Sequence, residues 1–140
     1  MTAATNETML GAARDLSLVE FVEPIAGFPT ERVFNLAPID EAGIFYTLRS
    51  TVTPTLRFIL MTPAARFADY DPRIPAGVLE AVGATVPAET SLLVILTVQK
   101  SLADATANLR APVIIGTGTR HAVQVVLEHD GLSFREPLAR

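Results

Sequence analysis

The hydrophobic residues of this chain occur in short runs that prolines and glycines interrupt. Ten prolines are spread through the 140 residues, and proline is disfavoured in helix interiors because it lacks the amide hydrogen and its ring clashes with the preceding turn. Short apolar runs between turn residues favour strands. We predict strands over residues 18–23, 32–36, 44–50, 56–62, 92–98, 112–115, 121–128 and 132–135. The pattern predicts a mostly-β, barrel-like fold of short antiparallel strands with one to three short helices.

The phase of the pattern indicates which faces of the strands are buried. Successive side chains of a strand point to opposite faces, so Val19 and Phe21 share one face of the first run. Run 92–98 is apolar nearly throughout, which indicates a central strand buried on both faces. Residues 116–120, with the sequence Gly-Thr-Gly-Thr-Arg, separate two runs and predict a hairpin.

Two segments have the features of short helices. Segment 76–82 has Pro75 near its start and Gly83 just past its end, which is the usual asymmetry of helix termini. Segment 102–109 follows Ser101, whose side chain can cap a helix, and carries an acidic residue in its first turn. The buried stripe of the first helix would consist of Val78, Leu79 and Val82.

The length of the chain fits one domain. We expect residues 16–140 to form this domain and residues 1–15 to be a mobile N-terminal tail. The tail has no basic start followed by an apolar run, so it does not resemble a secretory signal. The longest apolar run is far too short to span a bilayer. These features predict a cytoplasmic protein without a membrane partner.

Composition narrows the classes of function. The absence of cysteine excludes disulfides, thiolate metal sites and cysteine catalysis. The formal charge of −4 argues against broad nucleic-acid binding, which needs a basic surface. The same charge is compatible with a basic protein partner, although a modest negative charge also serves solubility.

No group of residues forms an enzyme or metal signature. On one strand, His121 and His129 would lie roughly 26 Å apart, too far to share a metal ion. The pair Gly116-x-Gly118 lacks the third glycine and the following helix of a phosphate-binding loop. Asp69 and Asp71 are near enough for acid–base work, but their setting is typical of a solvated turn. We therefore expect neither catalysis nor a metal or cofactor.

Two segments are richer in features than ordinary loops. Residues 24–29, Pro-Ile-Ala-Gly-Phe-Pro, place large apolar side chains inside a turn, and Ile25 and Phe28 are expected to plug one end of the barrel. Asn108 precedes Pro112 and the apolar run that follows it. We expect Asn108 to satisfy local backbone groups where one element gives way to the next.

The order and spacing of several motifs resemble the FliW family of flagellar assembly factors, over about residues 21–138. Residues 24–29 resemble the early Leu-Pro-Gly-Phe turn of that family, and residues 69–72 resemble its Pro-Asp-Tyr loop, with Ala68 in place of the usual proline. The other matching segments are Leu48-Arg49-Ser50, residues 106–115, Arg120, residues 124–127 and Arg135-Glu136-Pro137-Leu138.

The resemblance implies a small, non-catalytic, β-barrel-like cytoplasmic protein. Members of the family bind newly made flagellin and the translational repressor CsrA, an RNA-binding protein. Binding of CsrA relieves repression of flagellin mRNA. When flagellin accumulates, it occupies the family member and releases CsrA. By resemblance we expect these two partners, with CsrA only where the organism has it, and a monomer when no partner is bound.

Two other classes of function remain open on the residues alone. One is an enzyme or small-ligand carrier that uses the barrel mouth, and the other is a purely structural subunit. For partner docking we single out the loop at residues 67–72. Its Tyr70 either docks a partner or folds inward to cap the core. The candidate partner-binding residues are Asp69, Tyr70, Asp71, Asn108 and Arg135.

Overall fold

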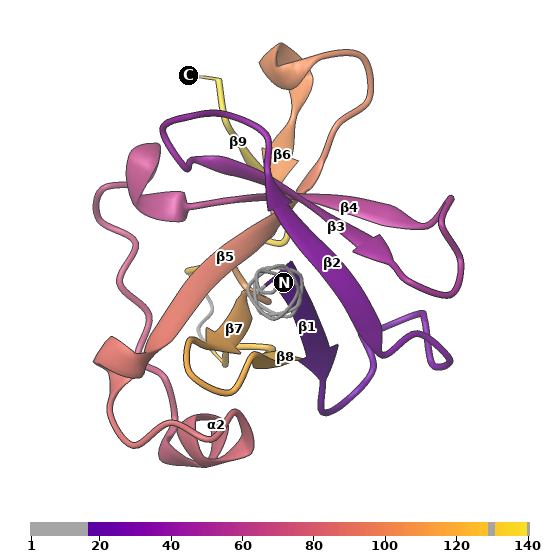
Figure 1. Ribbon diagram of the computed structural model, residues 1–140. Helices are drawn as coiled ribbons and strands as arrows, with labels where there is room; N and C mark the ends of the chain where they lie inside the picture. The colour runs from indigo at the N-terminus through magenta and orange to yellow at the C-terminus, as the bar shows by residue number, and fades with distance from the viewer. Residues whose placement is uncertain (1–16, 129–130, 140) are drawn as a thin grey trace.

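Strand pairing dominates residues 17–128 and 131–139, which are the residues that the computed structural model describes (Figure 1). The first four strands form an antiparallel meander in chain order, each pairing with the next. They lie within one or two residues of the predicted runs. The four strands are β1 (Leu18–Phe21), β2 (Val33–Pro38), β3 (Phe45–Ser50) and β4 (Arg57–Met61).

A later set of strands closes the meander into a seven-stranded barrel. Strand β5 (Thr90–Thr97) pairs with β4 and with β7 (Val113–Gly116), and β7 pairs with β8 (His121–Gln124) across the predicted hairpin. The barrel closes where β8 meets β1, with Glu20 opposite His121. This last pairing is parallel, so the expectation of antiparallel strands holds for every pairing between the described strands except one.

Two-residue strands extend the sheet beyond the barrel and correct two predictions. Segment 102–109 is not a helix: a 3₁₀ turn, η3 (Leu102–Asp104), is followed by strand β6 (Thr106–Ala107), which pairs with the end of β5. The backbone of this segment is satisfied by pairing with neighbouring strands, which buries Ala105 and Ala107. The last strand is β9 (Glu136–Pro137), not 132–135. The expected Ser101 cap is present, as a capping box with Asp104.

The predicted strand over 121–128 is shorter in the structure. Strand β8 ends at Gln124, although the amides of Val125 and Leu127 still donate to the carbonyls of Pro112 and Arg110. His129 lies outside the described residues, as does the predicted tail over residues 1–15.

One α-helix is present among the described residues, and it begins and ends as expected. Helix α2 (Ala76–Ala81) follows Pro75, and Gly83 just beyond it has a φ of +74°. Val78, Leu79 and Val82 pack together against the outside of the barrel. The remaining short helical turns are η1 (Pro63–Ala65) and η2 (Pro87–Glu89).

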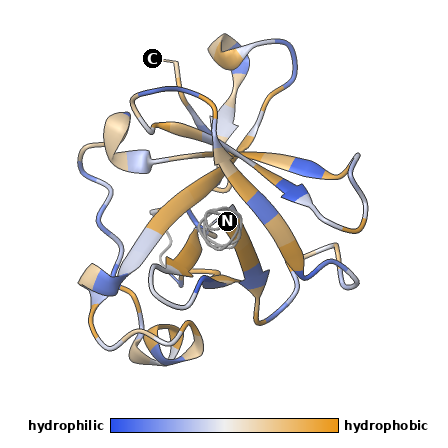
Figure 2. Cartoon of the chain, in the orientation of Figure 1, coloured by the Kyte–Doolittle hydropathy of each residue, from blue (hydrophilic) through white to orange (hydrophobic). Residues whose placement is uncertain are grey.

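The apolar residues are divided among the barrel interior and two clusters outside it. Strand β5 serves both sides, since Leu93 belongs to the interior cluster and Val94 to an outer one. This confirms burial on both faces for residues 92–96 of the predicted run, whereas Thr97 and Val98 are exposed. Figure 2 shows β5 as hydrophobic along most of its length. The side chains at the centre of the interior are those of Val19, Phe21, Phe34, Leu48, Leu60, Val113 and Ile115.

The predicted plug at residues 24–29 is confirmed. Ile25 is 3% exposed and belongs to the interior cluster, against which Phe28 packs. The ring of Phe28 meets the ring of Phe58 edge to face, with centroids 5.4 Å apart, a favourable geometry for aromatic pairs. The turn that carries both plug residues contains Gly27 with a φ of +91°, a conformation that glycine adopts without strain.

A buried carboxylate joins the start of β2 to the turn between β3 and β4. The carboxylate of Glu31, which is 8% exposed, accepts hydrogen bonds from the hydroxyls of Ser50 and Thr53, the latter at 3.0 Å, and from that of Thr30 at 3.4 Å. The Ser50 hydroxyl is the largest influence and lowers the pKa of Glu31 below its ordinary value of 4.5, while burial opposes it. The network stabilises the ionised form of Glu31.

This network predicts a loss of stability in acid. Because the pKa of Glu31 is lower in the folded chain than in the unfolded chain, the unfolded chain binds the proton more readily, and stability falls as the pH drops below about 4.5. We expect part of the fall in melting temperature between neutral pH and this range to disappear in Glu31→Gln. Calorimetric melting of both proteins measures it, with Glu23→Gln, at an exposed position, as the control. Parallel melting-temperature curves for wild type and Glu31→Gln would contradict the assignment.

None of the helices in the described part of the chain is both long and apolar enough to cross a membrane.

Candidate functional site

The loop after β4 presents two carboxylates around an anchored tyrosine. Asp69 and Asp71 are exposed, and Tyr70 between them is half-buried. The loop follows η1, where Pro63 starts a tight turn and its carbonyl accepts the amides of Arg66 and Phe67. The amide of Tyr70 in turn donates to the Phe67 carbonyl at 3.0 Å. These turns hold the loop in a compact shape that leaves Asp69 and Asp71 exposed to solvent.

The side chain of Tyr70 ties the loop to a distant part of the chain. Its hydroxyl donates a hydrogen bond of 2.7 Å to the carbonyl of Leu109, which lies between β6 and β7. Its ring packs against the outer cluster that includes Met61 and Phe67. Burial raises the pKa of Tyr70 to about 12. The geometry therefore gives Tyr70 the inward, structural contact that the sequence left as one of two alternatives, while leaving part of the ring exposed.

Two clefts meet at Tyr70. The smaller, of about 350 Å³, contains Asp69, Tyr70 and Leu109, together with Arg66, Leu132 and Glu136. The larger, of about 660 Å³, contains Tyr70 and Asp71 with several residues of the loop up to Ile74. An aromatic side chain flanked by two clefts with carboxylates at their edges suits a partner that offers apolar and basic groups.

Asn108 and Arg135 lie near this loop but line neither cleft. The side chain of Asn108 accepts the amide of Ala111 at 3.0 Å, which is the local backbone role expected for it. Arg135 is exposed, and its amide donates to the Ser133 hydroxyl at 2.9 Å. Each is the sequence neighbour of a cleft residue, Leu109 and Glu136 respectively. The structure thus places all five predicted site residues around one region, with direct cleft contacts for Asp69, Tyr70 and Asp71.

The remaining candidates for chemistry belong to the β7–β8 hairpin and lie outside both clefts. His121 is partly buried at the start of β8, and its amide donates to the Thr119 hydroxyl. Gly116 and Gly118 belong to the β7–β8 hairpin, as expected. Among residues 17–128 and 131–139, no group of three or more histidine, aspartate or glutamate side chains is placed to hold a metal ion.

Sequence reasoning missed two neighbours of the loop. Glu136 adds a second carboxylate to the smaller cleft. Arg110, next to Leu109, places its guanidinium carbon 5.4 Å from the ring centroid of Phe134, which is 50% exposed. Neither residue carries a local signal, because these contacts join segments that are distant in the sequence and are held together by the pairing of β6 with β9 and by the amides of Leu109 and Arg110, which donate to the Ser133 carbonyl.

Comparisons with known proteins agree on one family. The family model described as FliW protein matches residues 4–138. The flagellar assembly factor FliW of Heliobacterium modesticaldum is 39% identical over 114 residues, which cover 81% of this chain and 74% of that protein. That of Symbiobacterium thermophilum is 39% identical over 123 residues, covering 87% and 89%. A crystal structure of a flagellar assembly factor FliW superimposes with a TM-score of 0.80 at 33% identity, over 89% of this chain and 86% of the other.

Proposed function

The chain belongs to the FliW family of flagellar assembly factors, and on that premise we propose that it is a non-catalytic cytoplasmic regulator that binds flagellin and the translational repressor CsrA in turn. By binding CsrA it would relieve repression of flagellin mRNA. By binding flagellin, in a chaperone-like manner, it would release CsrA and restore the repression. The chain would thereby tie flagellin synthesis to the amount of flagellin that has accumulated.

The observation that carries the proposal is the match of residues 4–138 to the family model. The loop at Tyr70 is the candidate docking surface. Tyrosine is enriched among the interface residues that carry binding energy, and carboxylates at the rim raise association rates with basic partners. CsrA, as an RNA-binding protein, would offer basic groups of this kind.

A titration tests the partner exchange. Flagellin is added to a preformed complex of this chain with CsrA, and the fraction of CsrA in the complex is followed by size-exclusion chromatography with light scattering. We expect CsrA to be released as flagellin binds, because the two partners compete for one chain. A stable ternary complex at saturating flagellin would contradict mutually exclusive binding. In an organism without CsrA, flagellin binding alone remains to be measured.

Charge neutralisation tests the loop separately. The double variant Asp69→Asn with Asp71→Asn is expected to slow association with CsrA by roughly two- to tenfold at low salt, with a smaller effect at high salt. Stopped-flow or biosensor association rates measure it. The matched control is Glu23→Gln with Glu41→Gln, two exposed carboxylates outside both clefts. Equal rates for wild type and the loop variant would remove this loop from the docking site but would leave the partner exchange untouched.

A further inference from the structure

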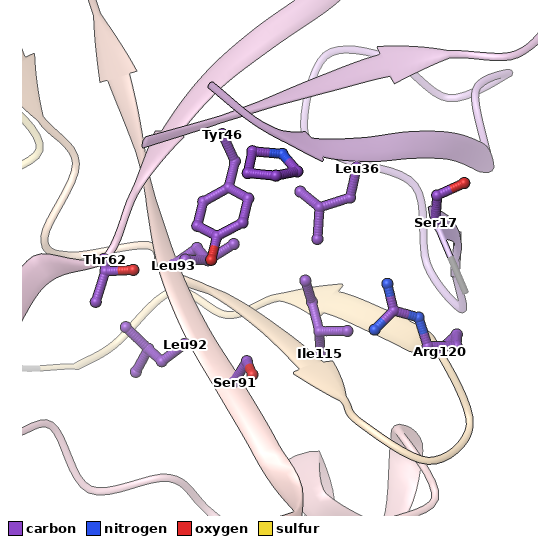
Figure 3. Close-up of a pocket in the computed structure, with 10 residues that line it drawn as sticks. Ser17, Leu36, Tyr46, Thr62, Ser91, Leu92, Leu93, Ile115 and Arg120 are labelled. Carbon is purple, nitrogen blue, oxygen red and sulfur yellow. The ribbon is translucent and has the colours of Figure 1, made fainter. Parts of the chain in front are cut away.

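A third cavity opens at the barrel mouth and adjoins the larger cleft at Tyr70, with which it shares Thr62 and Leu92. It has a volume of about 530 Å³, within the range of roughly 300–1,000 Å³ typical of small-molecule sites. Figure 3 shows side chains from several strands converging on it. Its walls are mainly apolar, with Leu36 from β2, Leu93 from β5 and Ile115 from β7. Tyr46 adds a ring and a hydroxyl.

One charged residue lines this cavity among the described residues, and it is Arg120. Its Nε is buried and has no hydrogen-bond partner within the part of the chain that the structure describes. Figure 3 shows the guanidinium group extending between Ser17 and Ile115. Buried polar groups in proteins are nearly always hydrogen-bonded, and a guanidinium offers five donors in a planar fork. The cavity therefore contains a cation with donor capacity that its own residues leave unused.

The backbone holds Arg120 in a conformation that side chains rarely adopt. Its φ is +63°, the one positive value among the described residues other than glycine. Hydrogen bonds fix both of its backbone groups: its amide donates to the Gly116 carbonyl at 2.9 Å, and its carbonyl accepts the amide of Glu20 at 3.0 Å. Strained residues of this kind persist where the surrounding structure enforces them, and they gather at functional sites.

We propose that this cavity binds a small amphiphilic monocarboxylate, with the carboxylate on Arg120 and the apolar tail against Leu36, Leu93 and Ile115. A guanidinium pairs with a carboxylate through two parallel hydrogen bonds. Within residues 17–128 and 131–139 no second cation lines the cavity, so a doubly charged phosphate would be poorly neutralised. The apolar walls suit an alkyl chain rather than a sugar. The proposal does not rest on the proposed protein partners.

The test uses the full chain with hexanoate, and with 1-hexanol as the neutral molecule of equal tail length. Binding is measured by chemical-shift titration of the methyl groups of Leu36, Leu93 and Ile115. We expect hexanoate to bind at this site about tenfold or more tightly than hexanol, because a hydrogen bond to a charged group supplies the difference. Methyl shifts that are absent with hexanoate, or equal affinities for the two molecules, would overturn the proposal. This comparison needs no variant and so does not depend on any variant folding.

Variants then locate the charge. Arg120→Gln should weaken hexanoate binding about tenfold and leave hexanol binding unchanged. Arg57→Gln, an exposed arginine on β4 that does not line the cavity, should change neither. If Arg120→Gln and wild type bind hexanoate equally, Arg120 is not the anchor and the proposal fails.

A short peptide that ends in leucine with an unblocked carboxylate tests whether the ligand is a small molecule or the end of a chain. Tighter binding of this peptide than of hexanoate would overturn the assignment to a small molecule in favour of a chain terminus.

Discussion

Tyr70→Ala is expected to lower the free energy of unfolding by about 3 kcal/mol, at the low end for removal of an aromatic side chain from a core. The ring packs against the outer cluster, and the hydroxyl holds the Leu109 carbonyl at 2.7 Å. Tyr70→Phe keeps the ring and removes only the hydrogen bond, so we expect a loss of about 1 kcal/mol. Urea denaturation followed by far-ultraviolet circular dichroism measures both values.

A second readout separates the hydroxyl from the ring. Burial raises the pKa of Tyr70 to about 12 from an ordinary value of 10, so the folded chain keeps the phenol proton where the unfolded chain has lost it. Stability from this group is thus present below pH 10 and declines as the pH rises from 10 towards 12. Tyr70→Phe should lack this alkaline component. If Tyr70→Ala barely alters stability and instead weakens partner binding, docking rather than anchoring is the main role of the ring.

Gly116→Ala is expected to cost about 3 kcal/mol, the upper part of the usual range for overpacking a core. A Cβ at this position would overlap the carbonyl oxygen of Val82 and lie 2.7 Å from the Thr119 hydroxyl oxygen. That hydroxyl donates to the same Val82 carbonyl at 2.5 Å, so it has little room to move. The end of helix α2 and the β7–β8 hairpin are therefore in close contact at Val82.

The matched control lies two residues away. A Cβ at Gly118 would meet no atom of the described residues within 4 Å, and the φ of Gly118 is not positive. Gly118→Ala should therefore change the free energy of unfolding by less than about 0.5 kcal/mol. The denaturation midpoints of the two variants measure this difference in stability. Similar midpoints would mean that the hairpin yields to the added methyl group, and the contact between Gly116 and Val82 would then not limit the position of α2.

The sequence predicted correctly those elements whose structure is determined by their own residues. Alternation in 18–23, proline and glycine around 76–82, and the capping pair of Ser101 and Asp104 each correspond to features of the structure. The helix predicted over 102–109 was wrong because the same residues pair with β5 and β9. The local sequence of 102–109 gives no information about these pairing partners, which lie elsewhere in the chain.

The same limit applies to the candidate site. The exposure of Asp69 and Asp71 follows from turn-forming neighbours, and it was predictable. The hydrogen bond from Tyr70 to Leu109 joins residues 39 positions apart, and the hydrophobic pattern of the sequence does not predict it. The positive φ of Arg120 depends on a hairpin that is held from both sides, so the sequence identified the turn but not the cavity that its last residue enters. Docking by the five candidate residues stays a prediction until partner binding is measured.

The parallel seam between β1 and β8 has a consequence for the synthesis of the chain. Glu20 and its neighbour His121 are separated by about one hundred residues, so the seam cannot form until most of the chain has left the ribosome. The β1–β4 meander consists of near neighbours and can assemble earlier, but its outer strands then offer unpaired edges, which are prone to pairing with other chains. Contacts between distant segments also slow folding. We therefore expect barrel closure to be a late and rate-limiting event, completed when β8 fills the gap beside β1.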